Sequence, residues 1–355
     1  MVLSIMTCLF ALLLSGQIWA NNQFNVSFSP DGGMFLAKNS DQITLWETKA
    51  GKLLKTFGSP KEDIYFDFAV FSANGKEVLL RNIQGELVWW NIASGKSHSV
   101  KMMKWLFVSS ISRDRKTIAT FGSSISKSSA FHGDMKFIHL YDTKTGKLTR
   151  KISIPDDDNK CLTFFPDDKL IAVTGINIKI ISIKTGRVIK TIPKSLINFS
   201  CAVSPDKKSM LFNNSFEKAE NGIWLEGLDG TKPKYPEKSS MDLFASTWSI
   251  GYSPNDPNIA FAAGLAAGKS GIMIIWDLRT GKVLQKFAHP FWLTNAAISP
   301  DGKTMLVQDA TDTQVSIDIE TGTVIRKYST NSLKEKDSET AHYSPSVYNM
   351  HVLAR

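Results

Sequence analysis

Residues 271–284, GIMIIWDLRTGKVL, decide how the rest of the chain folds. Residues 272–277 are apolar and rich in β-branched side chains, which favours a buried strand. Residues 280–282, Thr-Gly-Lys, are typical of a tight turn, because glycine adopts positive φ without a steric cost. Residues 283–284 begin a second apolar segment. The stretch therefore predicts a β-hairpin.

The same hairpin recurs along the chain. Its glycine is found at Gly51, Gly95, Gly146, Gly186, Gly230, Gly281 and Gly322, at spacings of 40 to 51 residues. Five residues before each glycine lies a large side chain: Trp46, Trp90, Tyr141, Ile181, Leu225, Trp276 or Ile317. The next position is polar and often acidic, as at Asp277. Seven copies at this period indicate a repeat fold.

A second motif precedes each hairpin. A short apolar segment ends in a Ser-Pro-Asp-Gly type turn, as in FSPDG at 28–32 and ISPDG at 298–302, and another apolar segment follows. Proline presets φ for this turn, and Asp and Gly suit the next positions. Each unit thus holds four short strands, which is the pattern of a propeller blade. We predict an all-β, seven-bladed β-propeller of four-stranded antiparallel blades, almost without helix.

The combined pattern F-S-P-D-G…I-x-L-W-D-x-x-T-G-K resembles the WD-repeat β-propeller family. It covers essentially the whole chain after residue 20 and is clearest in the first and the last two repeats. The Gly-His pair of the family survives only as His289, and the aspartate that would pair with it has only near-register candidates, Asp41 and Asp312. The resemblance implies a rigid ring that binds proteins, with blades held by packing rather than by a His–Asp network.

The two ends of the chain predict processing and ring closure. Residues 1–20 have no charged side chain and hold the apolar run CLFALLL at 8–14, which is typical of a secretory signal cut after Ala20. Residues 21–355 would then form one propeller domain, exported to the periplasm or the extracellular space. We expect residues 341–353 to help close the ring, with an incomplete eighth blade as the alternative. No other segment is long and apolar enough to span a membrane.

Charge and cysteine content narrow the function classes. The formal charge is +9, but many lysines fall in the hairpin turns and no run of Lys or Arg occurs. We therefore expect solvated turn residues and no specific nucleic-acid binding, with an acidic polymer as the alternative partner. After residue 20 only Cys161 and Cys201 remain. Two cysteines are no disulfide framework, so we expect buried thiols, with a disulfide as the alternative.

Local catalytic motifs are absent. The segment GLAAGKS at 264–270 lacks one residue of a phosphate-binding loop and precedes a strand instead of a helix. The six histidines show no zinc spacing, and there is no nucleophile elbow. We therefore predict no catalytic, cofactor-binding or metal-binding residues. The alternative is an envelope enzyme of the propeller lactonase or quinoprotein amine dehydrogenase-like type, with a site assembled from distant blades.

Aromatic residues mark a candidate interface. Tyr65, Trp105 and Trp292 each lie seven residues before a turn serine, where the first strand of a blade begins, and Phe291 is adjacent. Exposed aromatic side chains on a rigid rim are typical anchors for a protein partner. The alternative is that they pack between blades. The sequence thus favours a non-catalytic interaction scaffold with a protein or peptide partner.

Overall fold

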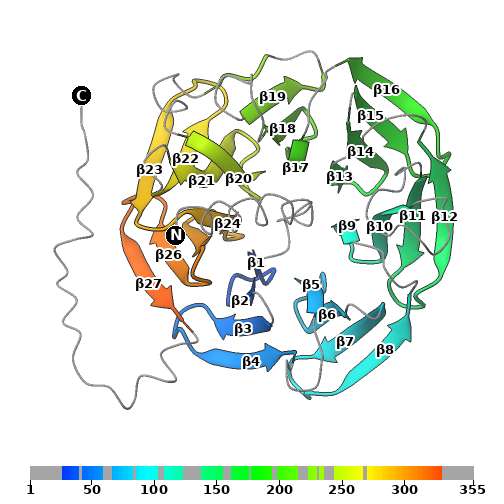
Figure 1. The fold of residues 1–355 in the computed structure, drawn as a ribbon, viewed down its shortest axis with the longest axis horizontal. Helices are drawn as coiled ribbons and strands as arrows, with labels where there is room; N and C mark the ends of the chain where they lie inside the picture. The colour runs from blue at the N-terminus through cyan, green and yellow to red at the C-terminus, as the bar shows by residue number, and fades with distance from the viewer. Residues whose placement is uncertain are drawn as a thin grey trace, which may run out of the picture.

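The chain folds into a ring of seven antiparallel sheets (Figure 1). This computed structural model describes residues 26–39, 42–58, 66–82, 85–102, 108–122, 137–154, 161–175, 177–193, 198–214, 223–229, 232–235, 244–266 and 270–329. The sheets follow one another in chain order and are called blades 1 to 7. The all-β, seven-bladed propeller predicted from the repeats is confirmed.

Each blade is built from one continuous stretch of chain. Blade 1 holds β1 (Val26–Phe28), β2 (Met34–Lys38), β3 (Ile43–Glu47) and β4 (Leu53–Phe57); blade 2 holds β5 (Phe66–Phe71), β6 (Glu77–Asn82), β7 (Glu86–Asn91) and β8 (Ser97–Lys101). Blade 3 holds β9 (Val108–Ile111), β10 (Thr117–Gly122), β11 (Phe137–Asp142) and β12 (Leu148–Ser153); blade 4 holds β13 (Cys161–Phe164), β14 (Leu170–Thr174), β15 (Asn177–Ser182) and β16 (Val188–Pro193).

The remaining blades follow the same order. Blade 5 holds β17 (Asn198–Val203), β18 (Ser209–Asn214) and β19 (Ile223–Gly227). Blade 6 holds β20 (Phe244–Tyr252), β21 (Ile259–Ala266), β22 (Gly271–Asp277) and β23 (Val283–His289); blade 7 holds β24 (Leu293–Ile298), β25 (Thr304–Asp309), β26 (Gln314–Asp318) and β27 (Val324–Tyr328). The first strand of each blade lies nearest the ring axis, and the last lies at the perimeter (Figure 1). The described residues form no helix that could cross a membrane.

The two turn motifs adopt the geometry that their residues favour. The described hairpin glycines have φ between 68° and 77°, a left-handed conformation that suits glycine: Gly51, Gly95, Gly146, Gly186, Gly281 and Gly322. Gly230 lies outside the described residues. In the Ser-Pro-Asp-Gly turns, Ser29 Oγ donates to Asp31 Oδ1 at 2.6 Å, and Ser299 Oγ donates to Asp301 Oδ1 at 2.6 Å. These serine hydrogen bonds are the largest cause of the lowered pKa of Asp31 and Asp301.

The large side chains of the hairpins pack between neighbouring blades, mostly against the preceding blade, whereas Leu225 of blade 5 packs against the following blade 6. Trp276 of blade 6 is fully buried in a cluster with Leu225 of blade 5, and Tyr141 of blade 3 packs with side chains of blade 2. Trp46 of blade 1 packs on blade 7, and Trp90, which is half-buried, contacts Phe57 of blade 1 with ring centroids 5.1 Å apart. Burial of such side chains drives blade association at about 25 cal/mol per Å² of apolar surface.

Blades 1 and 7 meet directly and close the ring. The Tyr328 hydroxyl of blade 7 donates to the Thr48 carbonyl of blade 1 at 2.8 Å, and Gln308 Nε2 donates to the Lys38 carbonyl at 2.8 Å. Since these blades are in contact, no eighth blade fits between them, and that alternative is wrong. The segments expected to be a signal (1–20) and a closing strand (341–353) lie outside the described residues.

Blade 5 departs from the four-stranded pattern. Its described residues form only three strands, and residues 232–235, at the place of a fourth strand, are irregular. Pro233 in this segment has no N–H to donate to a strand ladder. The Tyr235 hydroxyl takes over part of that role: it accepts from the Leu225 N–H at 2.8 Å and donates to the Leu225 carbonyl at 3.1 Å. One side chain thus satisfies a peptide group at the open edge of β19.

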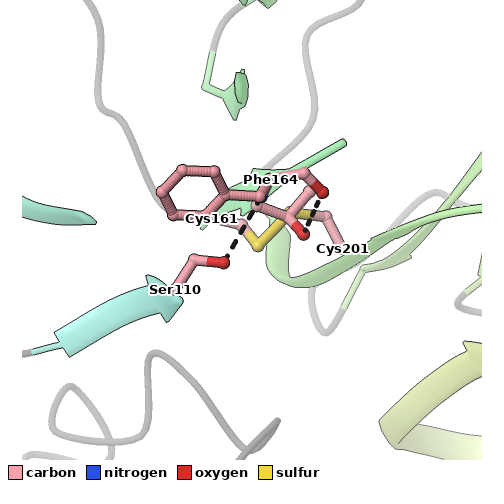
Figure 2. Close-up of a disulfide and its surroundings, with 5 residues drawn as sticks. Ser110, Cys161, Phe164 and Cys201 are labelled. Atoms are coloured by element: carbon pink, nitrogen blue, oxygen red, sulfur yellow. Dashed lines mark hydrogen bonds between the residues drawn. A yellow bond between two sulfur atoms is a disulfide. The ribbon is translucent and has the colours of Figure 1, made fainter. Parts of the chain in front are cut away.

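Cys161 and Cys201 form a disulfide, so the expectation of two free buried thiols is wrong (Figure 2). They lie on β13 and β17, the innermost strands of blades 4 and 5, with Cα atoms 6.1 Å apart. Innermost strands of neighbouring blades converge toward the axis, which brings residues of distant sequence together. On the other side of blade 4, Ser110 Oγ of β9 accepts a hydrogen bond from the Phe164 N–H at 3.3 Å (Figure 2). Covalent and polar contacts therefore join three consecutive blades.

Candidate functional site

Chain topology gives the ring two distinct faces. One, the connection face, holds the links from the outer strand of one blade to the innermost strand of the next, such as residues 290–292. The other, the turn face, holds the Ser-Pro-Asp-Gly type turns, such as 299–302, and the Thr-Gly-Lys hairpins, such as 280–282. The residues of the two repeated turn motifs are engaged in their own hydrogen bonds. The links on the connection face do not share a repeated motif, so their side chains differ from blade to blade.

An aromatic cluster of Trp248, Phe291 and Trp292 lies where blades 6 and 7 meet on the connection face. Phe291 and Trp292 are 51% and 43% exposed, the two most exposed aromatic residues in that link. Trp248, from the innermost strand of blade 6, stacks on Trp292 with centroids 6.0 Å apart and an interplanar angle of 29°. The cluster therefore presents large apolar area to solvent on a supported base.

The backbone of the link holds this cluster in place. The Phe291 N–H donates to His289 Nδ1 at 3.3 Å, and the Phe291 carbonyl lies 3.1 Å from the same nitrogen. The Trp292 carbonyl accepts from the Ala310 N–H at 3.0 Å. A side chain at Gly271 would collide with the Phe291 carbonyl, so the close approach of β22 to the link requires glycine. The aromatic side chains are thus anchored on both sides by main-chain contacts.

His289 has an acidic neighbour that the sequence did not indicate. Its Nε2 lies 3.8 Å from Asp309 Oδ2, and the two side chains are only 6% and 3% exposed. Of the two near-register candidates, Asp312 instead accepts from Gln308 Nε2 at 3.0 Å, whereas Asp41 lies outside the described residues and stays a prediction. At the seam of blades 6 and 7, a His–Asp contact supplements packing.

Asp309 also organises the loop beside it. Its Oδ1 accepts from the Thr311 N–H at 2.8 Å, the Thr311 hydroxyl at 2.6 Å and the Thr313 N–H at 3.1 Å. A carboxylate with this many donors is a structural cap. His289 and Asp309 are therefore buried structural residues beside the aromatic cluster, where the His289 ring lies 6.2 Å from the Phe291 ring between centroids.

The other sequence-predicted interface residues, Tyr65 and Trp105, lie outside the described residues, so their role stays a prediction. Phe244, which lies at the start of β20, is buried in the core shared by blades 5 and 6. Sequence reasoning missed Trp248. Trp248 lies five residues before the turn serine Ser253, whereas the aromatic residues selected by register lie seven before theirs. Because side chains two residues apart lie on the same side of a strand, this position could have been searched as well.

A hollow of about 370 Å³ lies on the turn face between blades 2 and 3. Its lining carries both charge signs, including Glu77, Asp114, Lys116 and Lys144, and one large aromatic residue, Trp89. The Trp89 Nε1–H donates to the Thr143 carbonyl at 3.1 Å, which joins the two blades across the hollow. Among the described residues no group of three His, Cys, Asp or Glu side chains is placed to hold a metal ion.

No protein-family model matches the chain, and no curated protein matches it. Solved structures do. One of them is hydrazine synthase from Kuenenia stuttgartiensis, with 15% sequence identity and a TM-score of 0.62, over 84% of this chain and 95% of that chain. At this identity the likeness concerns architecture. The chain is similar to known β-propellers in fold.

Proposed function

We propose that the protein is a non-catalytic β-propeller scaffold that binds a protein or peptide partner through the aromatic cluster of Trp248, Phe291 and Trp292. The observation that carries the proposal is the exposure of Phe291 and Trp292 on a link held rigid by His289 and Ala310. Rigid exposed aromatic residues contribute much of the affinity at protein interfaces, because their burial removes large apolar area from water at little entropic cost.

The chemistry of the cluster indicates the partner. A polar residue, Thr294, follows two positions after Trp292, and its hydroxyl donates to the Gln308 carbonyl at 3.2 Å. An apolar centre with a polar border is the usual composition of a protein interface. We infer a partner segment that places an apolar side chain between Phe291 and Trp292. The repeat pattern also supports kinship with the WD-repeat family, because the Ser-Pro-Asp-Gly turns and the Thr-Gly-Lys hairpins resemble the repeats of that family.

Export to the periplasm or extracellular space belongs to the same proposal. It is supported by the uncharged apolar pattern of residues 1–20 and by the Cys161–Cys201 disulfide. Disulfides persist mainly in oxidising compartments. The expected mature chain begins at Asn21, which N-terminal sequencing of the protein from its source would check. A mature chain that still begins at Met1 in a reducing compartment would contradict export.

Geometry gives the enzyme alternative less support. Among the described residues, the acid–base pair beside the cluster, His289 and Asp309, is buried, with side chains only 6% and 3% exposed, which does not favour contact with a substrate. The solved structure named above is titled as an enzyme, but a likeness of this degree carries no activity with it.

Site-specific crosslinking tests the proposal. A photoreactive phenylalanine analogue at position 292 should crosslink one partner in the native source, and the same analogue in place of Leu54, which is 40% exposed on β4, should not. The partner identified this way is then purified for direct binding measurements. The double variant Phe291→Ala/Trp292→Ala should weaken its binding at least about thirtyfold, a typical effect for two anchor residues.

The matched control is Leu54→Ala, which removes exposed apolar area on a different surface and should leave binding unchanged. Circular dichroism should show the same thermal transition for both variants as for the wild type. Unchanged affinity of the folded double variant would reject the aromatic cluster as the binding surface.

A further inference from the structure

The outer strands of the ring carry positive charge without any negative charge. In the six outer strands that the structure describes, β4, β8, β12, β16, β23 and β27, no residue is Asp or Glu. The cations on these strands, called the outer belt, are Lys55, Lys101, Arg150, Lys151, Lys190, Lys286, Arg326 and Lys327. All of them are exposed.

The third strands of the same blades are different. Five of these six third strands, β3, β7, β11, β22 and β26, hold at least one acidic residue, such as Asp142 or Asp318, and β15 holds none. Acidic side chains are thus kept at the hairpins, and the perimeter is left cationic. Lysines on edge strands discourage edge-to-edge aggregation. That role needs one charge on each edge, whereas β12 and β27 each carry two adjacent cations.

The outer belt continues across the seams between blades. Arg326 of blade 7 lies over the hairpin glycine Gly51 of blade 1, and Arg150 of blade 3 lies near Gly186 of blade 4. Lys190 of blade 4 donates from Nζ to the Leu228 carbonyl of blade 5 at 2.7 Å. In blade 5, whose fourth strand is absent from the described residues, Lys232 and Lys234 are exposed at the equivalent place. The positive charge therefore follows the circumference.

We propose that the outer belt binds a flexible acidic polysaccharide along the perimeter of the ring. A flexible chain can follow a convex edge and contact cations of several blades in turn. A polyanion that does so releases counterions, which makes its affinity strongly dependent on salt. Exposed aliphatic side chains between the cations, such as Leu148, Ile189 and Ile325, provide apolar contacts for the C–H faces of sugar rings.

The same strands are poorly suited to nucleic acid. Single strands are usually held by bases stacked on exposed aromatic rings. The Phe and Tyr residues of the six outer strands, Phe57, Phe287 and Tyr328, are all buried. At the equivalent place in blade 5, the single exposed ring of Tyr235 has its hydroxyl bonded to the Leu225 peptide groups. A DNA duplex, with a persistence length of about 150 base pairs, is too stiff to follow the circumference of a single domain. The outer belt thus favours a sugar polymer.

Heparin serves as the probe in the experiment, measured by fluorescence anisotropy with the full chain over a series of NaCl concentrations. The variant Arg150→Gln/Lys151→Gln/Arg326→Gln/Lys327→Gln removes four outer-belt cations from two distant blades. We expect its affinity at about 0.1 M salt to fall by roughly tenfold or more and its salt dependence to become about half as steep.

The matched control removes the same net charge from the turn face: Lys76→Gln/Lys116→Gln/Lys169→Gln/Lys208→Gln. Its affinity should change less than about twofold, because exposed charges more than about 10 Å away are screened at this ionic strength. Thermal unfolding must be the same for both variants and the wild type. Equal losses in the two variants would overturn the proposal in favour of net charge alone, and so would the absence of heparin binding at low salt.

Two further measurements distinguish polysaccharide binding at the outer belt from nucleic-acid binding and from binding at the aromatic cluster. Tighter binding of a labelled oligothymidylate of matched charge would overturn the choice of a sugar polymer. The variant Phe291→Ala/Trp292→Ala should bind heparin like the wild type, since the aromatic cluster lies on a different surface. A loss of heparin affinity in that variant would place the polysaccharide on the connection face instead of the outer belt.

Discussion

Blades 5 and 6 are neighbours built from the same repeat, yet they differ in completeness. Blade 6 has four strands, and every residue of β22 is buried. Blade 5 has three strands among its described residues, and Tyr235 satisfies the edge of β19. Both blades contribute to one apolar cluster that contains Leu225 and Trp276. The comparison indicates that the inner strands and the large apolar residues of the third strands hold these two blades together.

The largest effect should come from the large residue of blade 6. Trp276→Ala removes a fully buried side chain and should lower the free energy of unfolding by about 3–5 kcal/mol, measured by denaturant titration. The equivalent change in blade 5, Leu225→Ala, should cost less, about 2–3 kcal/mol, because a smaller cavity is left. A Trp276→Ala variant as stable as the wild type would contradict the view that this residue joins the blades.

The disulfide that joins blades 4 and 5 should have the next largest effect. The two cysteines are 40 residues apart in sequence, so loss of the crosslink in Cys161→Ala/Cys201→Ala should cost about 4 kcal/mol on the chain-entropy estimate. Reduction of the wild type should lower its unfolding temperature, and the same reductant should not affect the double variant. If reductant leaves the unfolding temperature of the wild type unchanged, the disulfide does not stabilise the contact between blades 4 and 5.

Tyr235→Phe tests the hydrogen bonds that the Tyr235 side chain makes at the edge of β19. The change removes the hydroxyl that bonds both the N–H and the carbonyl of Leu225, and should cost about 1–2 kcal/mol. Hydrogen exchange should quicken at the Leu225 amide, while the amide of Trp276 in blade 6 serves as the internal control. Unchanged exchange at Leu225 would show that the edge of β19 is protected by something other than Tyr235.

The smallest expected effect on the free energy of unfolding comes from a substitution in the hairpin of blade 6. The pKa of Asp277 is lowered, chiefly by the hydrogen bond from Arg279, whose Nη2 lies 2.7 Å from Oδ2. A carboxyl with a depressed folded pKa stabilises the fold above its unfolded pKa of about 3.9 and loses that contribution as the pH falls through the folded value.

Asp277→Asn should therefore cost about 1 kcal/mol at neutral pH, and the difference from the wild type should shrink below about pH 4. Blade 2 provides a natural comparison, because Asn91 at the equivalent position accepts from the Ser94 N–H at 2.9 Å. Urea titrations of both proteins at several pH values measure the difference. A difference that is the same at all pH values would mean that the charge of Asp277 contributes nothing.

The predicted architecture agrees with the structure because its signals are local. A glycine such as Gly281, a Ser-Pro-Asp turn and a strand of β-branched residues each specify their conformation within a few residues. Their regular recurrence then indicates the ring. The irregular backbone of residues 232–235, at the place of a fourth strand in blade 5, also has a local signal, Pro233, but the hairpin periodicity obscured it.

The candidate site was only partly accessible to such reasoning. Phe291 and Trp292 were selected by their register before a turn serine, and the structure leaves both exposed. Their support came from elsewhere: Trp248 belongs to another blade, and Asp309 lies 20 residues beyond His289. Those contacts depend on how blades approach one another, which no local pattern encodes.

The sequence by itself determined the number of blades, the order of strands within each blade and the position of the turns that the structure describes, since turn chemistry and strand periodicity act over short distances. The tertiary structure alone decided which residues meet across the seams. It paired Cys161 with Cys201, placed Trp248 beneath Trp292 and gathered the outer-strand cations on one perimeter. The physical reason is that closing the ring sets the distances between blades, and those distances are a property of the whole chain.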